Sequence, residues 1–117
     1  ITSPEEVWSF ELPPTEPNFI TTKSASGPRT TVSDTHDSLS GGILMIPSAD
    51  PGFDWIFSHG IAGFITKYGG ANSHMAIRAV ELGIPAVIGA GDSLFSLWSR
   101  ANSLRVDCAN RQVQILK

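Results

Sequence analysis

The residues best suited to chemistry in this chain surround His74, which follows a pair of glycines. An unperturbed imidazole has a pKa of about 6.5, so at neutral pH it is mostly uncharged and can attack a phosphoryl group. Gly69 and Gly70 can adopt positive φ and let a ligand approach the backbone. Asn72 and Ser73 are good N-cap residues, so we expect His74 in the first turn of a helix. That turn carries unpaired N–H groups and a positive charge of about half a unit, which suits a phosphate.

The same segment also has a purely structural interpretation. A single histidine after a glycine turn is commonly a surface residue or part of a cap, and a Gly-Gly pair alone is weak evidence of a site. Thr66, just before the turn, either lines the site with its hydroxyl or only ends a strand. Local chemistry therefore leaves a phosphoryl-transfer site and a structural turn both open.

The elements that would position this segment follow from apolar runs and capping signals. Apolar runs predict short buried strands at 42–46, 61–66 and 85–89. Capping residues, with Asp50-Pro51 before one segment and Gly83 after another, predict helices at 51–60, 73–82 and 92–101. Alternating apolar residues predict a closing hairpin from 104–106 and 113–115. This order of strands and helices predicts an α/β fold.

Residues 1–40 differ from the rest in composition and hold five of the eight prolines. We expect them to form an extended N-terminal arm with edge strands, or a linker from a preceding domain. Residues 41–117 are then expected to form the folded domain. A chain that begins at Ile1 rather than Met suggests a fragment or a processed product.

Composition argues against several classes of function. The net charge of −3 and the lack of a basic stripe argue against nucleic-acid binding. No apolar run approaches the roughly 18 residues of a membrane span, and no signal peptide is visible. Cys108 is the sole cysteine, and His36, His59 and His74 lack the spacing of metal ligands. We expect a cytoplasmic protein with no metal of its own, no nucleic-acid partner and no membrane partner.

Two consecutive motifs carry a resemblance to a known family. They read Gly69-Gly70-x-x-Ser73-His74-x-Ala76-Ile77-x-Ala79 and Leu82-Gly83-Ile84-Pro85-Ala86-Val87-x-Gly89. Together they resemble the swivelling phosphohistidine (mobile) domain of phosphoenolpyruvate-utilising enzymes. That family includes phosphoenolpyruvate synthase, pyruvate phosphate dikinase, rifampicin phosphotransferase and enzyme I of the bacterial sugar phosphotransferase system. Weaker similarity extends from Gly42 to about Ile115.

The resemblance implies a compact, three-layer β/β/α domain that moves between two active sites on neighbouring domains. It implies that His74 is phosphorylated at one site and dephosphorylated at the other. The phosphate-positioning residues that we expect beside it, from the chemistry of the turn and the helix start, are Gly69, Gly70, Asn72, Ser73 and Thr66. This chain would then be one domain of a phosphotransferase and not a complete enzyme. It would bind no cofactor itself, whereas magnesium and ATP or phosphoenolpyruvate would bind to the partner domains. The alternative is a non-catalytic docking or scaffolding module with the same fold.

The chain departs from the family pattern at two positions. Asn72 stands where many members have a threonine, so control by phosphorylation of that threonine is not expected here. Val80 stands where members commonly have an arginine, which would be a candidate phosphate ligand. Arg78 is an alternative phosphate ligand, but it projects about 160° away from position 80 around a helix, so we expect a solvated or domain-docking charge in preference to a ligand.

Overall fold

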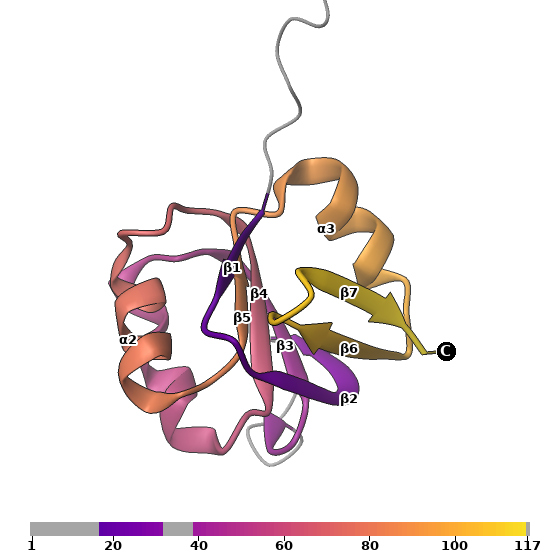
Figure 1. Ribbon diagram of the computed structural model, residues 1–117, viewed down its shortest axis with the longest axis horizontal. Helices are drawn as coiled ribbons and strands as arrows, with labels where there is room; N and C mark the ends of the chain where they lie inside the picture. The colour runs from indigo at the N-terminus through magenta and orange to yellow at the C-terminus, as the bar shows by residue number, and fades with distance from the viewer. Residues whose placement is uncertain (1–16, 32–38, 117) are drawn as a thin grey trace, which may run out of the picture.

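The computed structural model describes residues 17–31 and 39–116 of the chain. Within these ranges a mixed sheet is combined with three helical segments (Figure 1). The strands are β1 (Asn18–Ile20), β2 (Ser24–Thr31), β3 (Ile43–Ser48), β4 (Gly63–Tyr68), β5 (Ala86–Ile88), β6 (Ser103–Asp107) and β7 (Gln112–Ile115). The helices are η3 (Pro51–His59), which is a 3-10 helix, α2 (His74–Leu82) and α3 (Gly91–Ser99).

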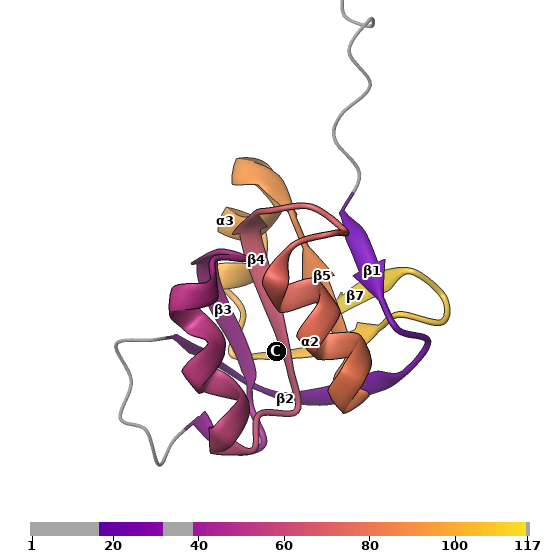
Figure 2. The ribbon, with the colours of Figure 1, turned by 90° about the vertical axis from the view of Figure 1, so that its left-hand side faces the viewer.

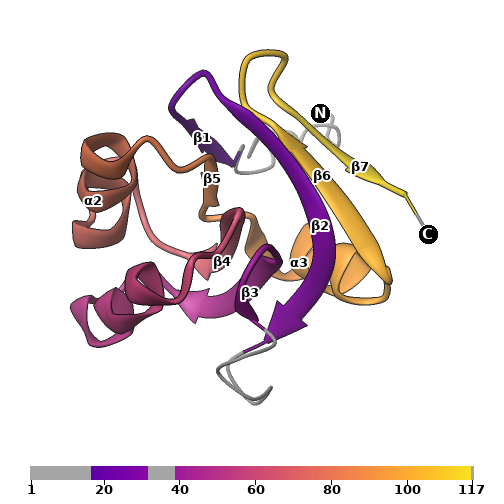
Figure 3. The same ribbon diagram turned by 90° about the horizontal axis from the view of Figure 1, so that it is seen from below.

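The sheet has the strand order β1-β5-β4-β3-β2-β6-β7. Strands β5, β4, β3 and β2 run parallel to one another, whereas β1 pairs antiparallel with β5, β6 with β2, and β7 with β6. Strand β2 pairs with β6 through residues 24–28 and with β3 through residues 29–31. Figure 3 shows the result: the sheet bends along β2, so β6 and β7 turn away from β3 and β4.

The bend in the sheet produces three layers. Helices α2 and η3 cover one face of the central parallel strands, and α3 with β6 and β7 covers the other (Figures 2 and 3). Alternate residues of β3 serve the two sides: Leu44 and Ile46 face the α2 side, and Ile43 and Met45 face the α3 side. A strand buried on both faces has the continuous apolar sequence seen here. The α/β fold expected from the sequence is confirmed.

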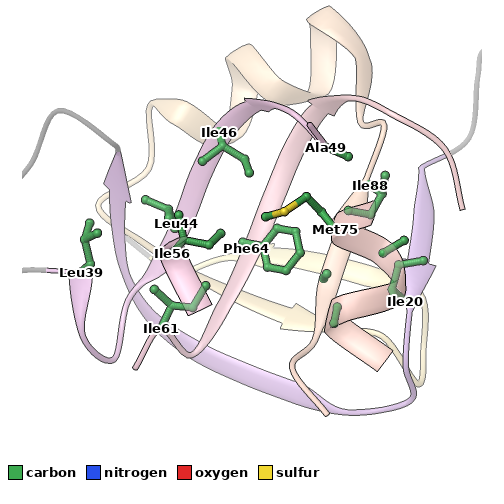
Figure 4. Packing of buried hydrophobic residues seen from close by; sticks show 13 residues of the cluster. Ile20, Leu39, Leu44, Ile46, Ala49, Ile56, Ile61, Phe64, Met75 and Ile88 are labelled. Atoms are coloured by element: carbon green, nitrogen blue, oxygen red, sulfur yellow. The ribbon is translucent and has the colours of Figure 1, made fainter. Parts of the chain in front are cut away.

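The core beneath α2 is built around Phe64 of β4 (Figure 4). Its ring is fully buried and meets Phe57 of η3 edge-to-face, with ring centroids 5.5 Å apart. Met75 lies over the sheet from the first turn of α2 and is also fully buried. The residue that follows the candidate nucleophile therefore anchors its helix to the sheet.

The predicted elements are present, with small differences at their ends. Strand β3 continues through Pro47 to Ser48 instead of ending at the proline. Its pairing with β2 ends at Met45, whereas its pairing with β4 continues to Ser48. Pro47 therefore lies where β3 has a paired neighbour on one side only, a position that tolerates a residue without an N–H. The helix expected after Asp50 is a 3-10 helix capped by Asp50 and ended by Gly60 at φ 68°.

Residues of the expected N-terminal arm take part in this sheet. Strand β1 lies at the edge beside β5, and β2 lies inside the sheet between β3 and β6. Residues 1–16 and 32–38 lie outside the described residues. The division of the chain at residue 41 stays a prediction.

We predict that Phe64→Ala lowers the free energy of unfolding by about 3–5 kcal/mol, because it leaves a cavity in a fully buried site. Urea unfolding followed by circular dichroism measures the change. Leu97→Ala is the control: Leu97 is 48% exposed on α3, and its truncation should change the stability by less than about 0.5 kcal/mol. Equal losses in the two variants would contradict the packing described here.

Candidate functional site

His74 is the first residue of α2 and follows the loop that leaves β4 at Tyr68 (Figure 2). The helix begins here because Ser73 is its N-cap, with an extended backbone and an Oγ that accepts a hydrogen bond from the N–H of Ala76 at 3.4 Å. The helix ends at Gly83, whose φ of 70° closes the last turn. The imidazole is 40% exposed, so it is accessible to another molecule.

The two glycines of the loop differ in conformation. Gly69 has a φ of 134°, and a Cβ there would lie 2.6 Å from the Cβ of Ala49. Gly70 has a φ outside the left-handed region, and a Cβ there would have no atom within 4 Å. Positive φ, expected for both glycines, is therefore required only at Gly69. Gly70 leaves open space beside the start of α2.

Thr66 is fully buried at the end of β4. Its hydroxyl donates to the carbonyl of Tyr68 at 2.9 Å and accepts from the N–H of Gly89 at 2.9 Å. These contacts tie the loop to the end of β5 and favour the structural interpretation of this threonine. Asn72 lies exposed in the loop, one residue before the N-cap.

Asp54 of η3 contacts the imidazole of His74. The Nε2 atom of His74 lies 2.8 Å from Oδ1 of Asp54, and the Nε atom of Arg78 lies 3.1 Å from the same oxygen. Arg78 also donates through Nη1 to Glu81 at 3.1 Å. Four side chains from two helices therefore form one polar cluster, defined by Asp54, His74, Arg78 and Glu81.

The cluster fixes where the imidazole carries hydrogen. The hydrogen bond from His74 is the largest cause that lowers the pKa of the Asp54 carboxyl below 3.8, and Arg78 acts in the same direction. Asp54 is therefore a carboxylate near neutral pH and can only accept hydrogen bonds. In this arrangement Nε2 of His74 carries the hydrogen and has no free lone pair.

From the sequence we expected a solvated or domain-docking charge at Arg78, and the structure places Arg78 in one cluster with His74 through Asp54, a residue that the sequence analysis did not single out. For Arg78 a signal was present: it follows His74 by four residues, and such residues are neighbours on one helix face. The angle between positions 78 and 80 around the helix says nothing about how close Arg78 lies to His74. Asp54 lies 20 residues before His74 on another element, and no local pattern indicates that contact.

Two other residues weighed from the sequence, His59 and Cys108, have different surroundings. His59 is in the last turn of η3, with its ring 5.4 Å from that of Trp55. Cys108 is buried, and burial raises the pKa of its thiol. A smaller fraction of the thiol is therefore ionised to the reactive thiolate. His36 lies outside the described residues.

Two further kinds of site are absent from the described residues. Among them no group of three or more His, Cys, Asp or Glu side chains is arranged to hold a metal ion. No helix in the same ranges is long and apolar enough to cross a membrane.

We predict that Gly69→Ala lowers the free energy of unfolding by about 1–3 kcal/mol, because alanine at this φ is strained and its Cβ meets Ala49. Gly70→Ala is the matched control and should change stability by less than about 0.5 kcal/mol. Urea unfolding of both variants makes the comparison. Equal destabilisation would show that the pair acts as one flexible unit.

We predict that His74→Ala and Arg78→Gln each raise the pKa of Asp54 toward 3.8, because each removes a hydrogen bond to its carboxylate. Carboxyl-carbon NMR titration measures this. A lowered folded-state pKa stabilises the fold above the ordinary value, and this stabilisation is lost as the pH falls through the lowered pKa. Asp92, whose pKa is lowered mainly by its hydrogen bond from Lys67, is the internal control and should not respond.

Comparison with proteins of known structure supports the fold. The solution NMR structure of a UPF0107 protein superimposes with a TM-score of 0.63 and 16% sequence identity, over 88% of this chain and 98% of that one. At that identity the likeness concerns the fold alone.

Sequence comparison identifies the family. Phosphoenolpyruvate synthase of Escherichia coli (strain K12) is 39% identical over 69 residues, which are 59% of this chain and 8% of that protein. Phosphoenolpyruvate synthase of Aeropyrum pernix is 43% identical over 54 residues, 45% of this chain and 6% of that protein. The matches thus span less than a tenth of these relatives. The model of the family "PEP-utilising enzyme, mobile domain" matches residues 39–111, where PEP is phosphoenolpyruvate. The chain therefore belongs to the mobile-domain family of phosphoenolpyruvate-utilising enzymes.

Proposed function

We propose that this chain is a phosphohistidine carrier within a multidomain phosphotransferase. It would relay a phosphoryl group on His74 between a nucleotide- or phosphoenolpyruvate-binding domain and an acceptor domain. The observation that carries the proposal is the placement of His74: an accessible imidazole at the first residue of α2, beside the open space of Gly70. A carrier must present its nucleophile to two different sites, and a buried histidine could not do so.

The transfer consists of two displacements. A nitrogen of the neutral imidazole attacks the phosphorus of the donor, and an N–P bond forms. The P–O bond to the donor breaks, and its electron pair leaves with the donor oxygen. At the second site an acceptor oxygen attacks the phosphorus, and the N–P electron pair returns to the ring.

The start of α2 supplies electrostatic support for these steps. The N–H groups of the first helical turn and the partial positive charge of the helix N-terminus favour the phosphoryl oxygens. Ser73 caps the helix and Gly69 takes the positive φ of the loop, and in this proposal Gly70 and Asn72, which precede the cap, would lie beside the bound phosphate. Thr66 contributes from beneath by holding the loop to β5.

In this proposal, other domains of the parent protein bind the phosphoryl donor and the acceptor. The relatives are more than ten times longer than the segments they share with this chain, which supports neighbouring domains that bind the donor and the acceptor. Magnesium and ATP or phosphoenolpyruvate would bind there.

The alternative is a docking or scaffolding module that keeps the fold without carrying phosphate. Two apolar residues on the solvent side of α2 favour it, since Ile77 is 52% exposed and Val80 is 62% exposed. Such residues suit contact with another domain. They do not explain an accessible histidine at the helix start, so the carrier is the better proposal.

We predict that the full-length protein containing this chain, incubated with radiolabelled ATP or phosphoenolpyruvate, acquires acid-labile, base-stable label on His74. His74→Ala should abolish the label, because it removes the nucleophile. His59→Ala should retain it, because His59 lies at the far end of η3. Mass spectrometry under alkaline conditions locates the modified residue. Equal labelling of the His74→Ala protein would overturn the carrier proposal, and no labelling of the wild type with either donor would favour the docking module.

A further inference from the structure

Two hydrogen-bond donors converge on one anionic oxygen in the Asp54–His74–Arg78–Glu81 cluster. Oδ1 of Asp54 accepts from Nε2 of His74 at 2.8 Å and from Nε of Arg78 at 3.1 Å. The structure thus contains a position, next to the imidazole nitrogen and within reach of a guanidinium, where a negatively charged oxygen is bound.

A phosphoryl group on Nε2 would place its own oxygens in this region. Each non-bridging oxygen lies two bonds from the nitrogen, at a distance similar to that of a hydrogen-bonded acceptor. Asp54 cannot remain there, because phosphorylated Nε2 has no hydrogen to donate and a carboxylate repels a phosphoryl dianion. The aspartate and the phosphoryl group therefore exclude each other.

Arg78 is positioned to bind either the carboxylate of Asp54 or a phosphoryl group on His74. It lies one turn after His74 on α2, its guanidinium carbon is 5.6 Å from the centre of the Phe57 ring, and Glu81 holds Nη1. A guanidinium has five donors in a rigid fork and binds phosphate oxygens in pairs. Loss of Asp54 from Nε would leave this donor beside the new phosphoryl oxygens.

We propose that Arg78 binds the phosphoryl group of phospho-His74, and that Asp54 occupies the same anion position until the group arrives. This inference rests on the proposed carrier function. When Asp54 leaves, solvent takes the Nε2 hydrogen and returns one to Nδ1, which frees the Nε2 lone pair. That lone pair bonds to phosphorus, the donor P–O bond breaks, and its electrons leave with the donor oxygen. Arg78 is then a positioning residue for the bound phosphate.

The test uses phosphoramidate, a chemical phosphoryl donor that needs no partner domain, on the 117-residue chain. Phosphorus NMR follows the ionisation of phospho-His74, whose signal is identified by its loss in His74→Ala. A neighbouring guanidinium favours the dianion, so Arg78→Gln should raise the pKa of the phosphoryl group by about one unit, a tenfold change in proton affinity. Arg78→Lys, which keeps the charge, should recover part of the difference.

Arg100→Gln is the matched control, because it removes the same charge from the end of α3 on the other side of the sheet. It should titrate like the wild type. The pKa of Asp54 supplies a second measurement and should be higher in the phosphorylated chain than in the unmodified one, because the hydrogen bond from Nε2 is gone.

The outcomes separate the two proposals. Identical phosphoryl titration in Arg78→Gln and wild type would overturn the role of Arg78, even where labelling of His74 by the full-length protein succeeds. An unchanged pKa of Asp54 after phosphorylation would overturn the exchange of anions. A clear Arg78 effect without enzymatic labelling would leave this site intact and remove the carrier function. Failure of phosphoramidate to modify His74 would contradict both.

Discussion

The backbones of Gly69 and Gly89 pass so close to each other that the fold depends on the absence of side chains there. A Cβ on Gly89 would lie 2.5 Å from the carbonyl oxygen of Gly69, and one on Gly69 would meet Ala49. This contact holds the loop after β4 against the end of β5. Hydrogen bonds from Ala49 to Tyr68 and from Gly89 to Thr66 keep it there. Because α2 starts from this loop, the position of His74 is set by main-chain packing. The site is therefore rigid on its sheet side and open on its solvent side.

Much of this arrangement could be predicted because its signals are local. Ser73 and Gly83 mark the two ends of α2 within ten residues, and capping chemistry acts over that range. The strands beneath it are continuous apolar runs, as required of strands covered on both faces. Strand β2 lacked such a signal: its sequence SASGPRTT is mostly polar and contains a proline. Its place between β3 and β6 follows from pairing with residues about 15 and 80 positions away, which no short window contains.

In the candidate site, too, the local features could be predicted from the sequence and the contacts between distant elements could not. His74 and its loop could be put forward as a candidate from residue types and spacing, since the histidine, the helix cap and the glycines are adjacent in sequence. The anion beside it could not, because Asp54 reaches His74 only when η3 and α2 pack side by side on the sheet. From the sequence there was also no reason to distinguish Gly69 from Gly70. Only the structure shows that a side chain at Gly69 would collide with Ala49, whereas one at Gly70 would meet no atom.

The ion pair between Arg78 and Glu81 would affect how tightly the proposed site binds the phosphoryl group of His74. A carrier that bound its phosphoryl group very tightly would load readily and unload poorly. The guanidinium of Arg78 is already paired with Glu81, and Asp54 binds it in the unphosphorylated structure. If His74 carries a phosphoryl group as proposed, these competing carboxylates would weaken the net attraction of Arg78 for it and so preserve its group-transfer potential. A half-buried arginine shared among these anions thus suits reversible transfer better than tight retention of the phosphoryl group.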